Sequence, residues 1–233
     1  MPHRSDPAPR TRTSPPAPPP AAPLAALAGR LAALPPSCGP VRLIAVDGHA
    51  GSGKTTFTAH LAEALPGGSA AVPVLHLDDI ATHTALFDWT DRLLEQVIAP
   101  LARGESARYS PYDWQTRAFG TPRTLPAAPV VLIEGVGAGR RALRPYLAGL
   151  LWMDVPRETA WARGRERDGA EQREFWAGWV AAEDRHFAGD PSRPRAQMLI
   201  RRTHEGYAVL PGPLMTAGPD QTVTEGEGPA PMC

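Results

Sequence analysis

The most distinctive chemical groups of this chain are the glycines, the lysine and the hydroxyl of one short segment. The sequence holds 24 lysine and arginine residues, and Lys54 is its single lysine. That lysine closes the run Gly48-His49-Ala50-Gly51-Ser52-Gly53-Lys54-Thr55, which has the spacing G-x-x-x-x-G-K-[ST]. In this spacing the backbone wraps a polyphosphate, the lysine reaches the β- and γ-phosphates, and the hydroxyl holds Mg²⁺. The segment, extended by Thr56, is therefore predicted to bind the phosphates of ATP.

The residues around this segment match the setting that such a loop requires. An apolar run at 41–47 precedes it, and residues 55–65 follow with the apolar spacing of a helix. Backbone N–H groups at the start of that helix would converge on the phosphates, aided by the helix dipole. A chance glycine-rich turn would not be flanked in this way, so a phosphate-binding loop is the favoured interpretation.

Acidic residues follow two further predicted strands. The run 72–77 ends in Asp78 and Asp79, and the apolar run 129–135 contains Glu134 near its end. In open α/β sheets, ligands bind beyond the carboxyl ends of the strands. Both aspartates are therefore expected to face the nucleotide cleft, and Glu134 occupies the place of a Walker B acid.

The remaining pattern predicts alternating helices and strands. Thr90 is expected to cap a helix that ends near Gly104, with Pro100 making its last turn irregular. A strand at 150–155, a helix from Pro156 and a last strand at 207–210 follow. This alternation predicts an α/β fold of three layers, in which helices cover both faces of a mainly parallel sheet.

Composition sets the limits of the domain and of its partners. The chain has 233 residues and a formal net charge of zero, which gives no electrostatic case for binding nucleic acid or an anionic membrane. Residues 1–23 and 216–233 are rich in proline, glycine and polar residues and are expected to be disordered, leaving 24–215 as one domain. Two cysteines far apart in the sequence argue against a disulfide framework and fit a cytoplasmic protein. Whether the chain forms a homo-oligomer is left open.

Several classes of nucleotide-binding protein can be set aside. A Ras-type switch reads its base with Asn-Lys-x-Asp, and the only lysine of this chain is already used in the phosphate-binding loop. A transporter ATPase signature is missing, and the chain is short for a helicase core. A kinase for a small molecule is the leading interpretation.

The chain resembles the uridine kinase and phosphoribulokinase branch of the P-loop kinases over about residues 41–209. The matching pieces occur in the order in which that family has them. They are Asp47-Gly48 to Thr55, Leu77-Asp78-Asp79, Phe87-Asp88-Trp89, Pro111-Tyr112-Asp113-Trp114, Ile133-Glu134-Gly135, and Arg163 with Arg167-Asp168.

This resemblance implies roles for the matched residues. Asp78 would accept the proton of the attacking hydroxyl, while Thr55 and Glu134 would hold Mg²⁺ directly or through water. Arg163 and Arg167, four residues apart on a predicted helix, would serve as lid cations around the transferring phosphoryl group. The alternative for these two arginines is a solvated helix face that forms ion pairs with neighbouring glutamates.

The acceptor motifs depart from the family pattern. Thr82 stands where the uridine branch has an acidic residue that holds the ribose, and Arg117 stands where a base-contacting histidine is expected. Asp79, Tyr112 and Arg117 are the candidate substrate residues, and an arginine there could recognise a carboxylate or phosphate. Uridine or cytidine is the first choice of acceptor. A sugar, pantothenate or a sugar phosphate, and a regulatory protein that binds ATP without catalysis, remain alternatives.

Overall fold

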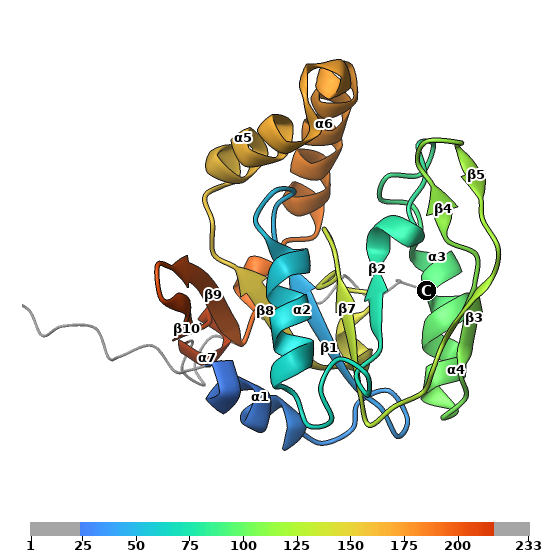
Figure 1. Ribbon diagram of the computed structural model, residues 1–233, viewed down its shortest axis with the longest axis vertical. Helices are drawn as coiled ribbons and strands as arrows, with labels where there is room; N and C mark the ends of the chain where they lie inside the picture. The colour runs from blue at the N-terminus through green and yellow to red at the C-terminus, as the bar shows by residue number, and fades with distance from the viewer. Residues whose placement is uncertain (1–23, 217–233) are drawn as a thin grey trace, which may run out of the picture.

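The computed structural model describes residues 24–216, and a six-stranded sheet forms its centre (Figure 1). The strands lie in the order β10-β9-β8-β1-β7-β2. Every neighbouring pair is parallel except β9 and β10, which form an antiparallel hairpin at one edge. The prediction of a mainly parallel sheet is confirmed. The strands are β1 Arg42–Asp47, β2 Val74–His76, β7 Val130–Glu134, β8 Leu147–Met153, β9 Met198–Thr203 and β10 Gly206–Pro211.

Strand β1 lies inside the sheet and is apolar on both of its faces. Leu43 and Ala45 pack into one buried cluster, whereas Ile44 and Val46 pack into another on the opposite face, because successive side chains of a strand point to opposite faces. The second cluster contains side chains from α1 (Leu24–Ala32) and α2 (Lys54–Ala64). The three layers are therefore built around this strand.

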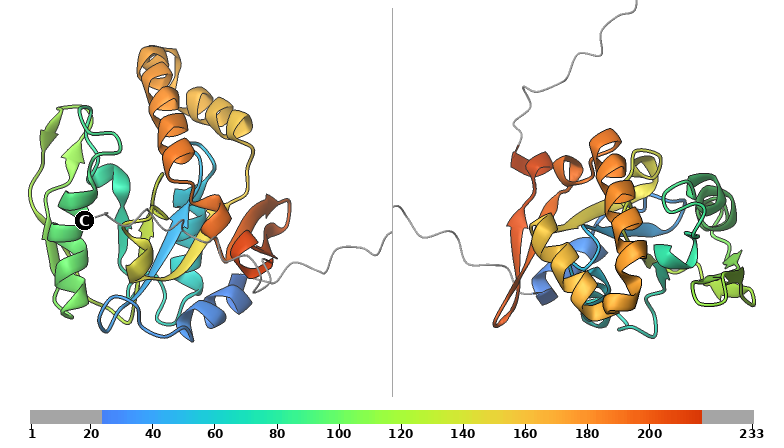
Figure 2. Two further views of the ribbon diagram at one scale, coloured as in Figure 1. Left: turned by 180° about the vertical axis from the view of Figure 1, so that it is seen from behind. Right: turned by 90° about the horizontal axis from the view of Figure 1, so that it is seen from above.

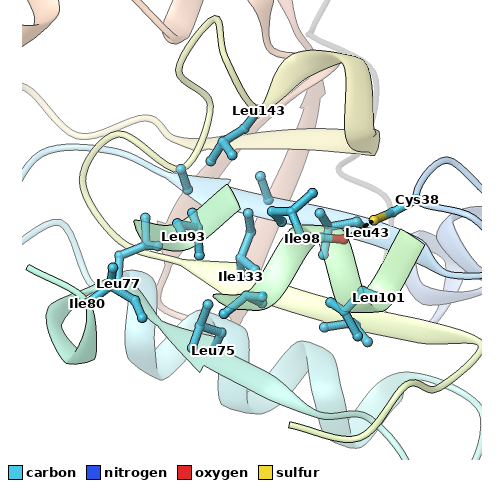
Figure 3. Packing of buried hydrophobic residues seen from close by; sticks show 14 of the residues in the cluster. Cys38, Leu43, Leu75, Leu77, Ile80, Leu93, Ile98, Leu101, Ile133 and Leu143 are labelled. Atoms are coloured by element: carbon cyan, nitrogen blue, oxygen red, sulfur yellow. Dashed lines mark hydrogen bonds between the residues drawn. The ribbon is translucent and has the colours of Figure 1, made fainter. Parts of the chain in front are cut away.

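A continuous helical segment, residues 90–102, covers the other face. It consists of α3 (Thr90–Leu93), a π-helical turn η2 (Leu94–Ile98) and α4 (Ala99–Ala102). Figure 3 shows side chains of this segment packed over β1 and β7. Pro100 has no N–H to donate to the carbonyl four residues earlier, and the wide turn comes directly before it. The start of the helix corrects one expectation, because Trp89 is the cap residue and Thr90 already lies inside the helix.

Two small β-ribbons form an arm beside the helical segment 90–102, where the sequence indicated only a loop (Figure 1). In the lower ribbon β3 (Ala107–Tyr109) pairs with β6 (Arg123–Leu125). In the outer ribbon β4 (Tyr112–Asp113) pairs with β5 (Ala118–Phe119). Arg117 closes the turn of the outer ribbon in the left-handed region, at φ 54°.

Two helices stand beyond the carboxyl ends of the strands. They are α5 (Arg157–Asp168) and α6 (Arg173–Gly189), and α6 runs from this end down to the face of the sheet opposite α2 (Figure 2). They pack tightly, since a Cβ on Gly164 of α5 would lie 2.3 Å from the Trp176 ring of α6. Trp176 is buried together with Trp161 and Trp179.

The ends of the described region give two further findings. The short helix α7 (Pro213–Thr216) extends one residue past the domain boundary expected at 215. The predicted tails at 1–23 and 217–233 lie outside the described residues. Among residues 24–216, no helix is long and apolar enough to cross a membrane.

Candidate active site

The predicted phosphate-binding loop joins β1 to α2 and depends on glycine at two positions. Gly51 has φ 80°, and a Cβ there would lie 2.0 Å from the carbonyl oxygen of Ala160 in α5. Gly53 has φ 91° and directly precedes Lys54, the first residue of α2. The loop therefore needs left-handed backbone, which favours glycine, and it lies directly against α5. The strand, loop and helix predicted from the sequence occur in that order.

Lys54 reaches back across this loop. Its Nζ donates to the carbonyl oxygens of Gly48 and His49, each at 3.0 Å, and the residue is only 8% exposed. The ammonium group is thereby held over the space that the loop encloses. A phosphate entering that space would meet a compact cation that is already in position.

Asp47, the last residue of β1, stabilises the loop through hydrogen bonds to backbone N–H groups. Its carboxylate is fully buried and accepts backbone N–H groups from Gly48 at 2.7 Å, Gly137 at 2.9 Å and Gly139 at 2.8 Å. These bonds tie the end of β1 to the turn that follows β7. Asp47 therefore fixes the phosphate-binding loop and the turn after β7 relative to each other. The sequence did not predict this role.

A cavity of about 790 Å³ opens beside the loop and brings together most of the predicted site residues. Its lining comes from the phosphate-binding loop, the turn after β2, the end of β7, the tip of the outer ribbon, and the helices α5 and α6. The predicted residues that line it are Ala50, Gly51, Gly53, Lys54, Thr55, Thr56, Asp78, Arg117, Glu134, Arg163 and Arg167. Gly48, His49 and Ser52 complete the loop behind this lining.

Thr55 and Glu134 bring a hydroxyl and a carboxylate together in this cavity. The Thr55 hydroxyl donates to Glu134 Oε1 at 2.9 Å, and Glu134 is only 4% exposed. Hydroxyl and carboxylate oxygens fit Mg²⁺, which is commonly bound through one or two protein groups and the phosphates of its substrate. The donor set therefore suits the magnesium ion expected from the sequence.

His76, to which the sequence assigned no role, lies against the same carboxylate. Its Nδ1 is 2.6 Å from Glu134 Oε1. The hydrogen bond to Glu134 raises the pKa of His76. Burial alone would raise the pKa of Glu134, but His76 and the charge of Lys54 outweigh it and lower that pKa. Glu134 is consequently held as a carboxylate, the form that can bind a cation.

Asp78 projects into the cavity from a short 3₁₀ turn, η1 (Leu77–Asp79), that follows β2. Although the side chain is open to the cavity, loss of hydration there raises its pKa, and the charge of Glu134 raises it further. The charges of Lys54 and Arg167 act in the opposite direction. Asp78 is therefore the carboxylate of this site whose proton affinity is increased.

Asp79 does not line the cavity, so the expectation that both aspartates face it is wrong. Its Oδ2 accepts the Tyr109 hydroxyl at 3.1 Å and lies 3.4 Å from Arg123. Both partners belong to the arm of two ribbons. In a 3₁₀ turn successive side chains diverge by about 120°, so the two aspartates point in different directions and Asp79 holds the arm instead.

The two candidate lid arginines both reach the cavity from α5. Arg167 forms an ion pair with its neighbour Asp168, at 2.6 Å from Nε and 2.9 Å from Nη2. Asp168 also accepts the indole N–H of Trp176 at 3.1 Å. Arg167 thus lies within electrostatic reach of Asp78 while it is anchored on its own helix.

Part of the lining of the cavity is aromatic. His83, Trp114, Phe175, Trp176 and Trp179 line it together with Arg117. Tyr112 does not line it, contrary to its predicted place in the acceptor site. Its hydroxyl lies 3.0 Å from Nδ1 of His83, which does line the cavity.

Glu183 of α6 is a residue of this site that the sequence did not reveal. Its carboxylate is fully buried and lies 2.6 Å from His49 Nδ1, and it accepts the backbone N–H of Ala50 at 3.1 Å. It also accepts the indole N–H groups of Trp161 at 3.0 Å and Trp179 at 2.9 Å. A single carboxylate therefore connects α6 to the phosphate-binding loop, although the two are at least 133 residues apart in the sequence.

Glu183→Gln is expected to lower the free energy of unfolding by about 3 kcal/mol, because an amide nitrogen would face N–H donors that now have an acceptor. Urea unfolding at pH 7 measures this loss. Glu174→Gln, an exposed change on the same helix, is the matched control and should have little effect. Equal stability of the two variants would contradict the assigned role of Glu183.

Comparisons with known proteins identify the fold. The chain matches a protein described as a possible uridine kinase from Bacillus stearothermophilus with a TM-score of 0.58 and 22% identity, over 76% of this chain and 96% of the other. It also matches a protein proposed to be a fructose transport system kinase from a Silicibacter species, with a TM-score of 0.45 and 23% identity, over 73% and 90% of the two chains. No protein-family model and no curated protein matched the sequence.

The first of these similarities spans nearly the whole of the other protein. At this level of identity it establishes the architecture, which agrees with the strand order and the loop geometry described above. The chain has the three-layer α/β fold of the P-loop kinases.

Proposed function

We propose that the protein is an ATP-dependent phosphotransferase that moves the γ-phosphate of Mg-ATP to a hydroxyl of a small metabolite. One observation carries this proposal: Lys54, Thr55, Glu134 and Asp78 line a single cavity. A cation for the phosphates, oxygen ligands for Mg²⁺ and a carboxylate for the acceptor are the groups that phosphoryl transfer needs.

Each residue has a defined task in this proposal. The backbone N–H groups of the phosphate-binding loop and the Lys54 ammonium bind the phosphates, while Thr55 and Glu134 hold the magnesium ion, which neutralises phosphate charge. Asp78 accepts the proton that leaves the attacking hydroxyl. Arg163 and Arg167 lie along the same cavity on α5 and add positive charge near the transferred group.

A nucleoside such as uridine or cytidine is the proposed acceptor. The aromatic residues of the lining support this choice, because the rings of Trp114 and Phe175 offer faces on which a base could stack. Arg117 in the same lining favours the alternative, an acceptor that carries a carboxylate or phosphate, such as pantothenate or a sugar phosphate. A regulatory protein that binds ATP without transferring phosphate remains the second candidate.

The test is ADP release from Mg-ATP across a panel of nucleosides, sugars, pantothenate and their phosphates. Lys54→Ala serves as the blank, since it lacks the phosphate-binding cation. ADP release that depends on uridine or cytidine supports a nucleoside kinase. ADP release that depends on an acidic acceptor supports the alternative, in which Arg117 binds the carboxylate or phosphate of the acceptor. ATP binding without turnover on any acceptor would contradict the kinase proposal and favour the regulatory protein.

The pH dependence of turnover gives a further prediction. A base must be ionised to act, so activity should rise with pH through the pKa of Asp78 in the folded protein. Because burial and Glu134 raise this pKa from its ordinary value of 3.8, the acidic limb of kcat/KM should lie above that value. A pH profile of kcat/KM measures the limb. An acidic limb at or below the ordinary value would contradict the assignment.

A further inference from the structure

His76 is the last residue of β2, and the sheet places it beside Glu134. Strands β2 and β7 are parallel neighbours, and their register pairs Val74 with Leu132 and His76 with Glu134. Val74 and Leu132 pack into the buried cluster that contains side chains of α2. Residues two apart on a strand share one face of the sheet, so the side chains of His76 and Glu134 point toward α2 as well.

The start of α2 brings a third group to this pair. Thr55 is the second residue of the helix, and its hydroxyl donates to Glu134 Oε1 at 2.9 Å. His76 Nδ1 lies 2.6 Å from the same oxygen atom. Two neighbouring strands and one helix therefore converge on a single carboxylate oxygen.

The contact between His76 and Glu134 has a defined direction. An ionised carboxylate only accepts hydrogen bonds, so the hydrogen of this contact is on Nδ1 of the imidazole. The neutral ring with its hydrogen on Nδ1 and the charged ring both satisfy this condition. The contact therefore requires no change in the protonation of His76.

The two oxygens of Glu134 have different surroundings. Oε1 accepts from His76 and from Thr55, whereas Oε2 accepts from no group within residues 24–216. Oε2 is not one of the buried atoms of the described region that lack a partner, so it has surface that a small ligand can reach. Because Glu134 lines the cavity, Oε2 is the oxygen that remains for a group bound there.

His76 itself lies outside this cavity. It is not one of the lining residues, and its side chain is 44% exposed. A ligand in the cavity therefore contacts Glu134 and not the imidazole. An effect of His76 on that ligand has to act through the carboxylate.

We propose that His76 is a positioning residue for magnesium: its Nδ1–H group holds Glu134 Oε1, so that Oε2 is directed to the ion or to one of its water molecules. This inference rests on the proposed function, in which Thr55 and Glu134 hold Mg²⁺. A carboxylate that is already fixed at one oxygen loses less freedom when the ion binds. Loss of such an outer hydrogen bond typically weakens metal binding by about 10- to 100-fold.

The test measures the affinity of the full chain for the non-hydrolysable ATP analogue AMP-PNP by calorimetry, once with Mg²⁺ and once with EDTA. The ratio of the two affinities gives the contribution of the ion, and it requires no turnover. A general defect of the fold or of the phosphate-binding loop lowers both affinities. A defect in the position of Glu134 lowers only the affinity with Mg²⁺.

Two substitutions separate the donor of His76 from its ring. His76→Asn keeps a donor, because the amide Nδ2 is bonded to Cγ as Nδ1 of histidine is. His76→Phe keeps a ring and has no donor. We expect His76→Phe to lower the affinity with Mg²⁺ by about tenfold and to leave the affinity with EDTA unchanged. His76→Asn should retain most of the affinity with Mg²⁺.

Two further variants complete the experiment. His204→Ala, an exposed change in the turn between β9 and β10, is the control and should alter neither affinity. Glu134→Ala removes the carboxylate and should itself lower the affinity with Mg²⁺. In the Glu134→Ala protein the change His76→Phe should have no additional effect, because the group that His76 positions is gone.

Three results would overturn the proposal. The first is an unchanged ratio in His76→Phe while Glu134→Ala lowers it, which removes the role of His76 and leaves the proposed function intact. The second is an equal loss in His76→Asn and His76→Phe, which would assign the effect to packing of the ring. The third is an unmodified protein whose affinity for AMP-PNP is the same with Mg²⁺ and with EDTA, which would contradict the proposed function and this inference together.

Discussion

Asp78→Asn is expected to lower kcat by about 10³-fold while Mg-ATP still binds, because general-base catalysis contributes on the order of 10²- to 10⁴-fold. Asparagine has nearly the shape of aspartate but cannot take the proton of the attacking hydroxyl. Within residues 24–216 the Asp78 carboxylate forms no hydrogen bond or ion pair that anchors the cavity wall; the Trp114 indole donates instead to the backbone oxygen of residue 78, at 2.9 Å. Single-turnover transfer and nucleotide titration measure the two quantities separately.

Asp78→Asn should lower turnover without lowering the stability of the fold. A loss of activity in this variant can therefore be told apart from a folding defect. The raised pKa of Asp78 means that the folded protein binds the proton more tightly than the unfolded chain does. The ionised carboxylate therefore costs stability above its pKa, and stability falls as pH rises through the interval between the two values. At pH 7 Asp78→Asn should unfold at a temperature equal to or above that of the unmodified protein. Turnover close to the unmodified rate would show that Asp78 is not the base.

Lys54→Ala is expected to abolish measurable turnover and to weaken Mg-ATP binding by about 100-fold, as the loss of charge-assisted hydrogen bonds to phosphate predicts. The ammonium is held by the carbonyl oxygens of Gly48 and His49 above the loop. No other lysine exists in the chain to replace it. Nucleotide titration by calorimetry and ADP release measure the two effects.

Lys54→Arg is the matched variant, because it keeps the charge and changes only the shape of the cation. The planar guanidinium is wider than an ammonium and carries its donors in a fixed fork. Lys54 is only 8% exposed, and its ammonium group lies against the carbonyl oxygens of a tight loop. The larger guanidinium should therefore not restore turnover. Full activity of Lys54→Arg would show that charge alone is required at this position.

The parts of the fold that follow local rules were predictable. The loop at 48–55 carries its chemistry in consecutive residues, and β1 and β7 are continuous apolar runs, which is typical of buried parallel strands. Glu134 could be predicted for the same reason, since it ends such a run. The order of strands and helices then followed from their alternation.

The parts that depend on distant contacts were not predictable in this way. The strands of the arm are two or three residues long, too short to show a period of their own. Glu183 acts on a loop 133 residues or more away, and nothing near it in the sequence marks a buried carboxylate. The direction of Asp79 was wrong because the strand before it ends at His76 and a 3₁₀ turn follows.

The buried ammonium of the phosphate-binding loop has one more consequence. Apart from the α-amino group of the chain, Lys54 is the only primary amine in the protein, and two carbonyl oxygens enclose it. An amine-reactive reagent that resembles a nucleotide would therefore attach a covalent label at a single side chain. The fraction of labelled protein would count occupied nucleotide sites directly, without a reporter being engineered into the sequence.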